Sequence, residues 1–273
     1  MNIISIKTFL TVVRIGHLNR AAIELNITQS AVTARLDALD DALGSRLLNR
    51  SRKGATMTKA GYAFLEQAEV MVHMWDTAKA RISLPHGIKS LFSMVADPSL
   101  WQGLGNLWLD ELRSTYADIA FEVWTARAHE AQGWLLSGVS DAALLPEPLS
   151  GAGIASRIFH RQRLVQVSTQ ARNRVTWDPH YVLVDYGTKF RADHAQAWPG
   201  EDSASMTFSN PEWAMNHILN HGGSAYLPVS MAAPYLESGK LHNVAGSPIF
   251  ERTIYLNWRT SCDEQFVWLK QTF

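Results

Sequence analysis

Polar side chains suited to contacting the edges of DNA bases lie close together near the start of the chain. Residues 18–25 carry apolar side chains at helical spacing, and the small pair Ala21 and Ala22 allows a second helix to cross closely. Thr28 is well suited to cap that second helix. We expect DNA contacts from the residues that lie away from its apolar face, together with the cap: Thr28, Gln29, Ser30, Thr33 and Arg35.

The charge of the first 60 residues supports phosphate binding by this end of the chain. Nine Lys and Arg residues stand there against four Asp and Glu residues, a net charge of about +5, whereas the whole chain has a formal net charge of 0. Clustered cations bind DNA through counterion release. A basic hairpin after the second helix supplies part of this charge, so we expect phosphate contacts from Arg50, Arg52 and Lys53. The alternative is a small solvated helical domain with a chance excess of basic residues, which the hairpin disfavours.

The same stretch resembles the N-terminal signature of LysR-type transcriptional regulators. The matching residues are Ala21, Ala22, Leu25, the run 28–33, Leu36, Leu39, Leu43, Gly44, Leu47, Leu48, Arg50 and the run 58–61. The resemblance implies a winged helix-turn-helix DNA-binding domain over residues 1–57. One position departs from it, because many members have Arg where this chain has Ala34, and here the cation comes one residue later at Arg35. One residue is about 100° around a helix, so the usual base contact at that position does not carry over.

A long helical pattern follows, from residue 58 to about Leu84, and ends before Pro85. Its apolar residues are spaced alternately four and three apart, as in the seam of a two-stranded coiled coil. The seam consists of Phe64, Ala68, Met71, Trp75, Ala78 and Ile82. The alternative is one amphipathic helix packed on its own domain, because the run covers only about two and a half heptads. The resemblance implies a dimerising linker over residues 58–87, and two-fold related half-sites favour a dimeric reader, so we expect a dimer or tetramer.

From residue 88 the pattern changes to alternating strands and helices. The expected strands are 91–96, 119–125, 142–145, 158–168, 181–185, 225–227 and 254–258. The expected helices are 103–115, 129–136, 211–220, 232–237 and a closing helix 264–270. This order predicts an effector-binding domain over 88–273 in two α/β lobes, lobe I from about 88–160 plus 260–273 and lobe II from about 161–259. A cleft between such lobes leaves strand ends and helix N-termini free to hold a small molecule.

The second region resembles the effector domain of LysR-type regulators, which has the fold of periplasmic solute-binding proteins. The resemblance rests on residues 141–145, on the Gly-rich turn and Leu-Pro of 221–228, and on 239–241. Residues 96–101, 108–109 and 186–187 are similar to the subgroup related to a repressor of the flagellar master operon. The expected fold class is α/β with an all-α winged helix-turn-helix N-terminal domain, a long linker helix and a two-lobed, periplasmic-binding-protein-like effector domain.

The resemblance places the effector at the ends of the first strands of each lobe and at the crossover between lobes. The residues at those positions are Asp97, Ser99, Trp101, Thr125, Arg127, Ser168, Thr169 and Ser209. Polar and aromatic side chains together can orient a small organic ligand. The forked cation of Arg127 suits a carboxylate, so we favour an anionic effector. Two alternatives stay open. Arg127 is then a solvated surface residue, or Asp97 caps the following helix and its negative charge disfavours the binding of anions in the cleft.

Other kinds of site lack candidates in the sequence. His217 and His221 are four residues apart on an expected helix, but no Asp or Glu accompanies them at ligand spacing, so we expect no metal. We find no Gly-x-Ser-x-Gly, phosphate-loop or dinucleotide motif, and therefore expect no cofactor and no enzyme activity. Cys262 is the one cysteine, which excludes an intramolecular disulfide. With no signal-peptide pattern and no run of about 18 apolar residues, we expect a cytoplasmic protein without a membrane partner.

These patterns together predict a sequence-specific, DNA-binding transcriptional regulator of LysR type that responds to a small-molecule effector bound between two lobes. Its expected partners are double-stranded promoter DNA, the effector and further copies of itself, with RNA polymerase a further partner to consider. Two alternatives belong to other classes: a cytoplasmic solute-binding protein with an accessory DNA-binding domain, and a cleft enzyme tethered to DNA. Promoter binding separates the first from the regulator, and turnover by the lobes would reveal the second.

Overall fold

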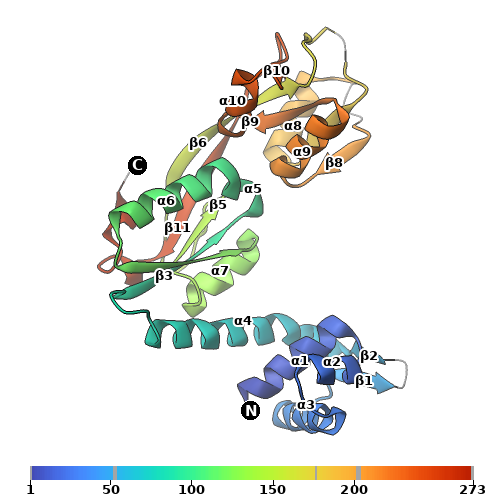
Figure 1. Ribbon diagram of the computed structural model, residues 1–273, viewed down its shortest axis with the longest axis vertical. Helices are drawn as coiled ribbons and strands as arrows, with labels where there is room; N and C mark the ends of the chain where they lie inside the picture. Colours follow the sequence, from blue (N-terminus) through green and yellow to red (C-terminus); the bar gives the residue numbers. More distant parts are fainter. Residues whose placement is uncertain (1, 52–53, 176, 201–203, 272–273) are drawn as a thin grey trace. The chain divides into compact units, whose positions relative to one another are not determined.

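The chain divides into two compact units, Met1–His86 and Gly87–Phe273. The computed structural model describes residues 2–51, 54–175, 177–200 and 204–271 (Figure 1). Within these ranges no helix has both the length and the apolar composition to cross a membrane.

The first unit is a helical domain with a two-stranded hairpin. Its elements are α1 (Ile3–Ile15), α2 (Leu18–Glu24), α3 (Gln29–Leu43), β1 (Leu48–Ser51), β2 (Gly54–Met57) and α4 (Lys59–Ile82). Thr28 caps α3 as expected, because its Oγ1 accepts the N–H of Ala31 at 3.2 Å. Helix α1 was not among the expected elements, although its buried face completes the domain core: the rings of Phe9 and Phe64 lie 5.6 Å apart between centroids.

The hairpin β1–β2 is held against the turn between α1 and α2. A Cβ atom at Gly54 would lie 2.6 Å from the carbonyl oxygen of Gly16, so this close approach requires glycine. The N–H of Ala55 donates to that same oxygen at 2.8 Å. The hairpin therefore has a fixed position beside the two helices that precede α3.

The second unit contains a nine-stranded sheet in the order β4-β3-β5-β11-β6-β9-β7-β8, with β10 paired to β6. Its strands are β3 (Ser90–Ala96), β4 (Ile119–Thr125), β5 (Ala142–Leu145), β6 (Ile154–Ser168), β7 (Tyr181–Val184), β8 (Met206–Phe208), β9 (Ser224–Pro228), β10 (His242–Asn243) and β11 (Phe250–Arg259). Its helical segments are α5 (Pro98–Leu100), the π-helical η1 (Trp101–Gly105), α6 (Asn106–Thr115), α7 (Ala128–Ser137), α8 (Thr188–Ala197), α9 (Pro211–His221), α10 (Val229–Glu237), and the 3₁₀ turns η2 (Thr260–Cys262) and η3 (Val267–Lys270).

Two lobes share this sheet. Strands β3, β4 and β5 run parallel in lobe I, and β7, β8 and β9 run parallel in lobe II. The long strands β6 and β11 pair antiparallel, from Leu164 with Phe250 to Ile154 with Arg259, and pass through both lobes (Figure 1). Each lobe has its own apolar core, one around Phe92 and Trp268 and the other around Val184 and Leu227. The expected two-lobed α/β organisation is thus confirmed.

The structure differs from the expected elements in two informative places. Helix α8 was not predicted, because only Phe190 and His194 among its residues are buried, which leaves a weak periodic signal. The expected closing helix 264–270 is wrong: a turn and the 3₁₀ segment Val267–Lys270 stand there. Phe266 and Trp268 are both 1% exposed in the lobe I core, and residues two apart on an α-helix point in nearly opposite directions.

A buried carboxylate joins three segments of lobe I at the start of β5. Asp141 Oδ2 accepts the N–H of Ser93 at 2.9 Å, and Oδ1 accepts from Arg259 Nη2 at 2.6 Å. The Cys262 thiol lies 3.5 Å from the same Oδ1, and burial together with this carboxylate raises the pKa of the thiol to about 11. Cys262 is therefore a protonated packing residue at neutral pH.

We predict that Asp141→Ala lowers the free energy of unfolding by about 3–5 kcal/mol, because it leaves a half-buried guanidinium and a buried N–H without their acceptor. Urea denaturation of the full chain, followed by tryptophan fluorescence, measures the change. The matched control is Asp118→Ala, which removes an exposed ion pair with Lys89 at 2.9 Å and is expected to have little effect. Equal losses in both variants would contradict the role given to burial.

Candidate functional site

Part of the predicted DNA-contacting set lies around one hollow on the first unit. Gln29 and Ser30 are exposed in the first turn of α3, and Thr33 is half-buried one turn later. The hollow has a volume of about 440 Å³ and is lined by His17, Leu18, Asn19, Gln29, Thr33, Arg50 and Ser51. The starts of α2 and α3 therefore meet strand β1 at this point, with polar side chains from all three segments.

Arg50 lies at this hollow but its cation is already engaged. Its Nη1 is 2.5 Å from Asp37 Oδ1, its Nη2 is 2.7 Å from Asp40 Oδ2, and its side chain is 21% exposed. Asp40 also accepts the N–H of Leu47 at 3.0 Å through its other oxygen. Arg50 thus braces strand β1 against two successive turns of α3, a role that the sequence pattern did not reveal.

The other predicted DNA-contacting residues lie elsewhere. Arg35 is half-buried and donates to Thr8 Oγ1 on α1 at 3.4 Å, because two residues after Thr33 is about 200° around the helix. Arg52 and Lys53 lie outside the described residues. Arg20 and Arg46 are exposed and form no ion pair with any residue that the structure describes, so they are cations that the sequence reasoning passed over. The sequence signal for a phosphate contact was their position, Arg20 in the first helix of the predicted pair and Arg46 just before the predicted hairpin.

The predicted seam on α4 is divided between two environments. Phe64 and Ala68 are buried in the core of their own domain, as the alternative interpretation of the pattern expected, and Met71 packs at its edge. Beyond them Trp75 is 48% exposed and Ile82 is 86% exposed. Ala78 is also exposed, and so is Met74 outside the seam. Only the second half of α4 therefore presents an uncovered apolar face.

A polar cavity of about 490 Å³ lies between the two lobes of the second unit. It is lined by Asp97, Pro98, Ser99, Arg127, Ala128, Pro146, Glu147, Asp185, Tyr186, Gly187, Ser209, Asn210, Trp213 and Arg252. Most of these residues follow the carboxyl ends of parallel strands: β3, β4 and β5 from lobe I, and β7 and β8 from lobe II. The topology of each lobe thus directs its loops into one shared cavity.

Four of the predicted effector residues line this cavity: Asp97, Ser99, Arg127 and Ser209. Asp97 does cap the following segment, since its Oδ1 accepts the N–H of Ser99 at 2.8 Å. Arg127 is exposed at the start of α7, where its N–H donates to Glu130 Oε2 at 2.9 Å. Its guanidinium forms no ion pair within the described ranges.

The other four predicted effector residues do not line the cavity. Ser168 ends β6 and Thr169 follows it. Because β6 runs antiparallel to β9, Ser168 pairs with Ser224, which in turn pairs with Tyr181 at the start of β7, away from the cavity-facing end of that strand. Thr125 is exposed at the end of the edge strand β4. Trp101 packs against the lobe I core. The rule that strand ends meet at one edge fails for β6 because this strand is antiparallel.

Arg252 is the cavity residue that the sequence reasoning missed. Its Nε donates to Gln162 Oε1 at 2.6 Å, and its Nη1 and Nη2 reach Ser99 Oγ and the Ser99 carbonyl, both at 3.2 Å. The guanidinium carbon lies 4.6 Å from the ring centroid of Tyr186. Arg252 therefore contacts lobe I, β6 and lobe II at once. The available signal in the sequence was its position two residues before Ile254, because alternate residues of a strand point to the same face and Ile254 is buried.

The Arg252 cation forms no ion pair with the described carboxylates around the cavity. Asp185 is paired with Arg191 at 2.9 Å, whereas Arg252 has no ion-pair partner among the residues that the structure describes. Burial lowers the pKa of the Arg252 guanidinium, but an arginine remains charged at neutral pH. A desolvated cation beside hydroxyl and aromatic groups is suited to a ligand that carries a negative charge.

No group of three His, Cys, Asp or Glu side chains that could hold a metal ion occurs in the described part of the chain. The rings of His217 and His221 do lie together, 4.8 Å apart between centroids. Because no third ligand accompanies these two imidazoles among the described residues, we interpret the pair as a ring contact within α9.

Comparison with known families matches both units. A model described as "Bacterial regulatory helix-turn-helix protein, lysR family" matches residues 4–62, and one described as "LysR substrate binding domain" matches residues 86–266. The HTH-type transcriptional regulator HdfR of Escherichia fergusonii is 30% identical over 263 residues, which cover 95% of this chain and 92% of the relative. HdfR of Escherichia coli O17:K52:H18 is 29% identical over the same shares of the two chains.

Solved structures show the same fold. Full-length CbnR complexed with its target DNA has a TM-score of 0.72 at 18% identity and covers 98% of each chain. Full-length LysG from Corynebacterium glutamicum with bound effector Arg has a TM-score of 0.51 at 18% identity, over 98% of this chain and 95% of that chain. With both family models matched in chain order and a relative aligned over nearly its full length, the chain belongs to the LysR family and is a DNA-binding transcriptional regulator with an effector-binding domain.

Proposed function

We propose that this regulator reads its operator with the first turns of α3, dimerises through the second half of α4, and senses a small anionic effector in the interlobe cavity. The observation that carries the proposal is the cavity itself, in which Arg127 and the unpaired Arg252 face loops from both lobes. An effector that contacts both lobes favours one arrangement of them, and this differential binding is what an allosteric signal to DNA requires.

For base reading, Gln29 has the best position among the predicted residues. It is exposed at the first position of α3, and it lines the hollow of about 440 Å³ to which strand β1 of the hairpin also contributes. An amide side chain can form two hydrogen bonds to the exposed edge of adenine in the major groove. Arg50 stabilises this surface through its ion pairs with Asp37 and Asp40. Arg20 and Arg46 are exposed, so they are better placed than the half-buried Arg35 to contact phosphates.

For assembly, the exposed half of α4 supplies the apolar surface. Trp75, Ala78 and Ile82 keep the spacing of the predicted seam, and a large exposed apolar face on a helix is typical of an interaction site. Phe64 and Ala68 belong to the domain core in this proposal, so the dimer contact is shorter than the full seam. Two copies would present two DNA-reading units to two half-sites.

For location and chemistry, we propose a cytoplasmic regulator that is not an enzyme. Two aligned relatives are named transcriptional regulators, and DNA is reached from the cytoplasm in bacteria. The titratable cavity residues are Arg127, Arg252, Asp97, Glu147 and Asp185, a set that suits ligand binding more than nucleophilic catalysis. The domain boundaries near residues 57 and 87 are part of the same proposal.

We predict that Gln29→Ala weakens binding to the preferred operator by about 1–3 kcal/mol and leaves binding to unrelated DNA nearly unchanged, because amide contacts to bases carry sequence information. The operator is first selected from random duplexes with the wild-type protein, and affinities are then measured by fluorescence anisotropy at fixed salt. Arg50→Ala is the contrasting variant and is expected to weaken binding to all DNA sequences alike. A melting curve of this variant shows whether the loss of the ion pairs has destabilised the β1–β2 hairpin. Equal losses on operator and unrelated DNA would remove Gln29 from the base-reading residues.

We predict that Trp75→Glu converts the dimer to a monomer and reduces operator affinity, because it places a charge in the desolvated contact between two helices. Sedimentation velocity of the full chain measures the mass. Tyr62→Glu is the matched control, since Tyr62 is an exposed aromatic residue on another face of the same helix. A Trp75→Glu protein that remains a dimer would show that self-association uses another surface.

We predict that short, polar organic acids raise the melting temperature of the wild-type full chain and that Arg127→Ala removes most of this shift, because the variant loses a carboxylate partner in the cavity. Thermal-shift screening compares mono- and dicarboxylates with neutral amides and amines of equal length. Arg113→Ala, an exposed arginine on α6, is the control and should keep the shift. Stabilisation by amines alone would reverse the assignment and point to Asp97, Glu147 and Asp185.

A further inference from the structure

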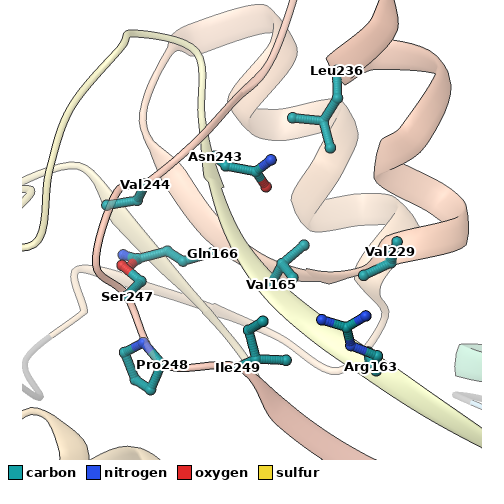
Figure 2. A pocket seen from close by; sticks show the side chains of 10 residues that line it. All are labelled: Arg163, Val165, Gln166, Val229, Leu236, Asn243, Val244, Ser247, Pro248 and Ile249. Carbon is teal, nitrogen blue, oxygen red and sulfur yellow. The ribbon is translucent and has the colours of Figure 1, made fainter.

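A second pocket, of about 310 Å³, lies within lobe II and shares no lining residue with the interlobe cavity. Figure 2 shows strand β6 crossing it, with side chains from α10 on one side of the strand and from the loop before β11 on the other. Its apolar lining consists of Val165, Val229, Leu236, Val244, Pro248 and Ile249. A volume at this end of the range for ligand sites suits a small molecule with a hydrocarbon body.

One charged side chain lines this pocket, and it is the cation Arg163. Arg163 is exposed and forms no ion pair with any residue in the described ranges. Its cross-strand neighbour Glu251 carries a carboxylate, but Glu251 Oε1 is bound to Arg161 Nη1 at 3.3 Å. An arginine without a carboxylate partner above an apolar pocket favours a ligand that brings its own negative charge.

Polar side chains at the pocket are fixed in position. Gln166 is 5% exposed, and its Oε1 accepts the hydroxyl of Ser247 at 2.5 Å. That bond fixes the orientation of the Gln166 amide, which lines the pocket, and no described residue accepts a hydrogen bond from its N–H₂ group. The amide of Asn243 adds a second neutral polar group to the lining. A buried amide held in one orientation can form directional hydrogen bonds with a ligand.

We propose that this pocket binds a small amphipathic carboxylate, such as a medium-chain monocarboxylic acid. Its carboxylate pairs with Arg163, and its hydrocarbon body packs against Val165, Leu236 and Ile249. The polar interlobe cavity, in contrast, has charged groups of both signs and suits a short, hydrophilic acid. The two sites therefore select ligands by the amount of apolar surface as well as by charge.

The test compares sodium hexanoate with hexylamine, hexanamide and sodium acetate by calorimetric titration of the full chain. A ligand with the size of hexanoate can reach a dissociation constant of about 1 mM or below. We expect hexanoate to bind about tenfold or more tightly than the other three, because only hexanoate combines the charge with the hydrocarbon body.

Four variants locate the binding. Arg163→Ala should weaken hexanoate about tenfold or more, while Arg113→Ala, which removes an exposed arginine on α6 and leaves the ion pair of Glu251 intact, should keep the wild-type affinity. Arg127→Ala should also keep it, because Arg127 belongs to the interlobe cavity. Val229→Trp, which fills the pocket from the start of α10, should block hexanoate in a protein whose melting curve shows that it is folded.

The proposal would be overturned by an absence of saturable hexanoate binding, by equal affinity for hexanoate and hexylamine, or by equal losses in Arg163→Ala and Arg113→Ala. Loss of hexanoate binding in Arg127→Ala alone would place the ligand in the interlobe cavity, and would reject this pocket while leaving the proposed effector site intact.

Discussion

The antiparallel pairing of β6 and β11 is the constraint on which the second unit depends. These two strands pair from Phe250 with Leu164 to Arg259 with Ile154, and each lobe adds its own parallel strands to the pair. Because both lobes extend one shared ribbon, the loops after their parallel strands face each other across it. The same ribbon carries Arg252 into the interlobe cavity and Arg163, five residues before the end of β6 at Ser168, to the second pocket.

Local signals predicted much of the fold from the sequence, and non-local ones account for what was missed. Thr28 could be assigned as a cap because the residues that it satisfies are its immediate neighbours. The bracing of Arg50 by Asp37 and Asp40 could not be assigned, because it depends on how the hairpin packs on α3. Strand-end reasoning brought Asp97 and Arg127 to one place, and both line the interlobe cavity, whereas Ser168 does not, because the direction of its strand is set by long-range pairing.

Helix α4 shows how one periodic pattern can serve two surfaces. A heptad spacing records that side chains share a face, but it does not record which partner covers that face. Here Phe64 and Ala68 are covered by α1 and its neighbours, while Trp75 and Ile82, about two and four turns after Ala68, are not. An ion pair between Lys7 of α1 and Asp76 of α4, at 2.7 Å, lies next to Trp75 in the sequence. Substitutions at the two ends of the pattern are therefore expected to report on different properties: folding at Phe64 and, in the proposed assembly, association at Trp75.

Arg252 connects the stability of the second unit to its ligand. Partial burial of a guanidinium that has no ion-pair partner is unfavourable, and hydrogen bonds to Gln162 and Ser99, the ring of Tyr186 and the attraction of the Asp97 carboxylate offset this cost. An anion bound in the cavity would supply the missing charge, and it would do so only where Ser99 of lobe I and Tyr186 of lobe II both remain in contact with Arg252. Under the proposed function, such a ligand would bind one arrangement of the lobes more tightly than others, which is the thermodynamic condition for a conformational response. In this proposal, the half-buried Arg252 cation, which has no ion-pair partner among the described residues, is the group that makes the arrangement of the lobes sensitive to an anion.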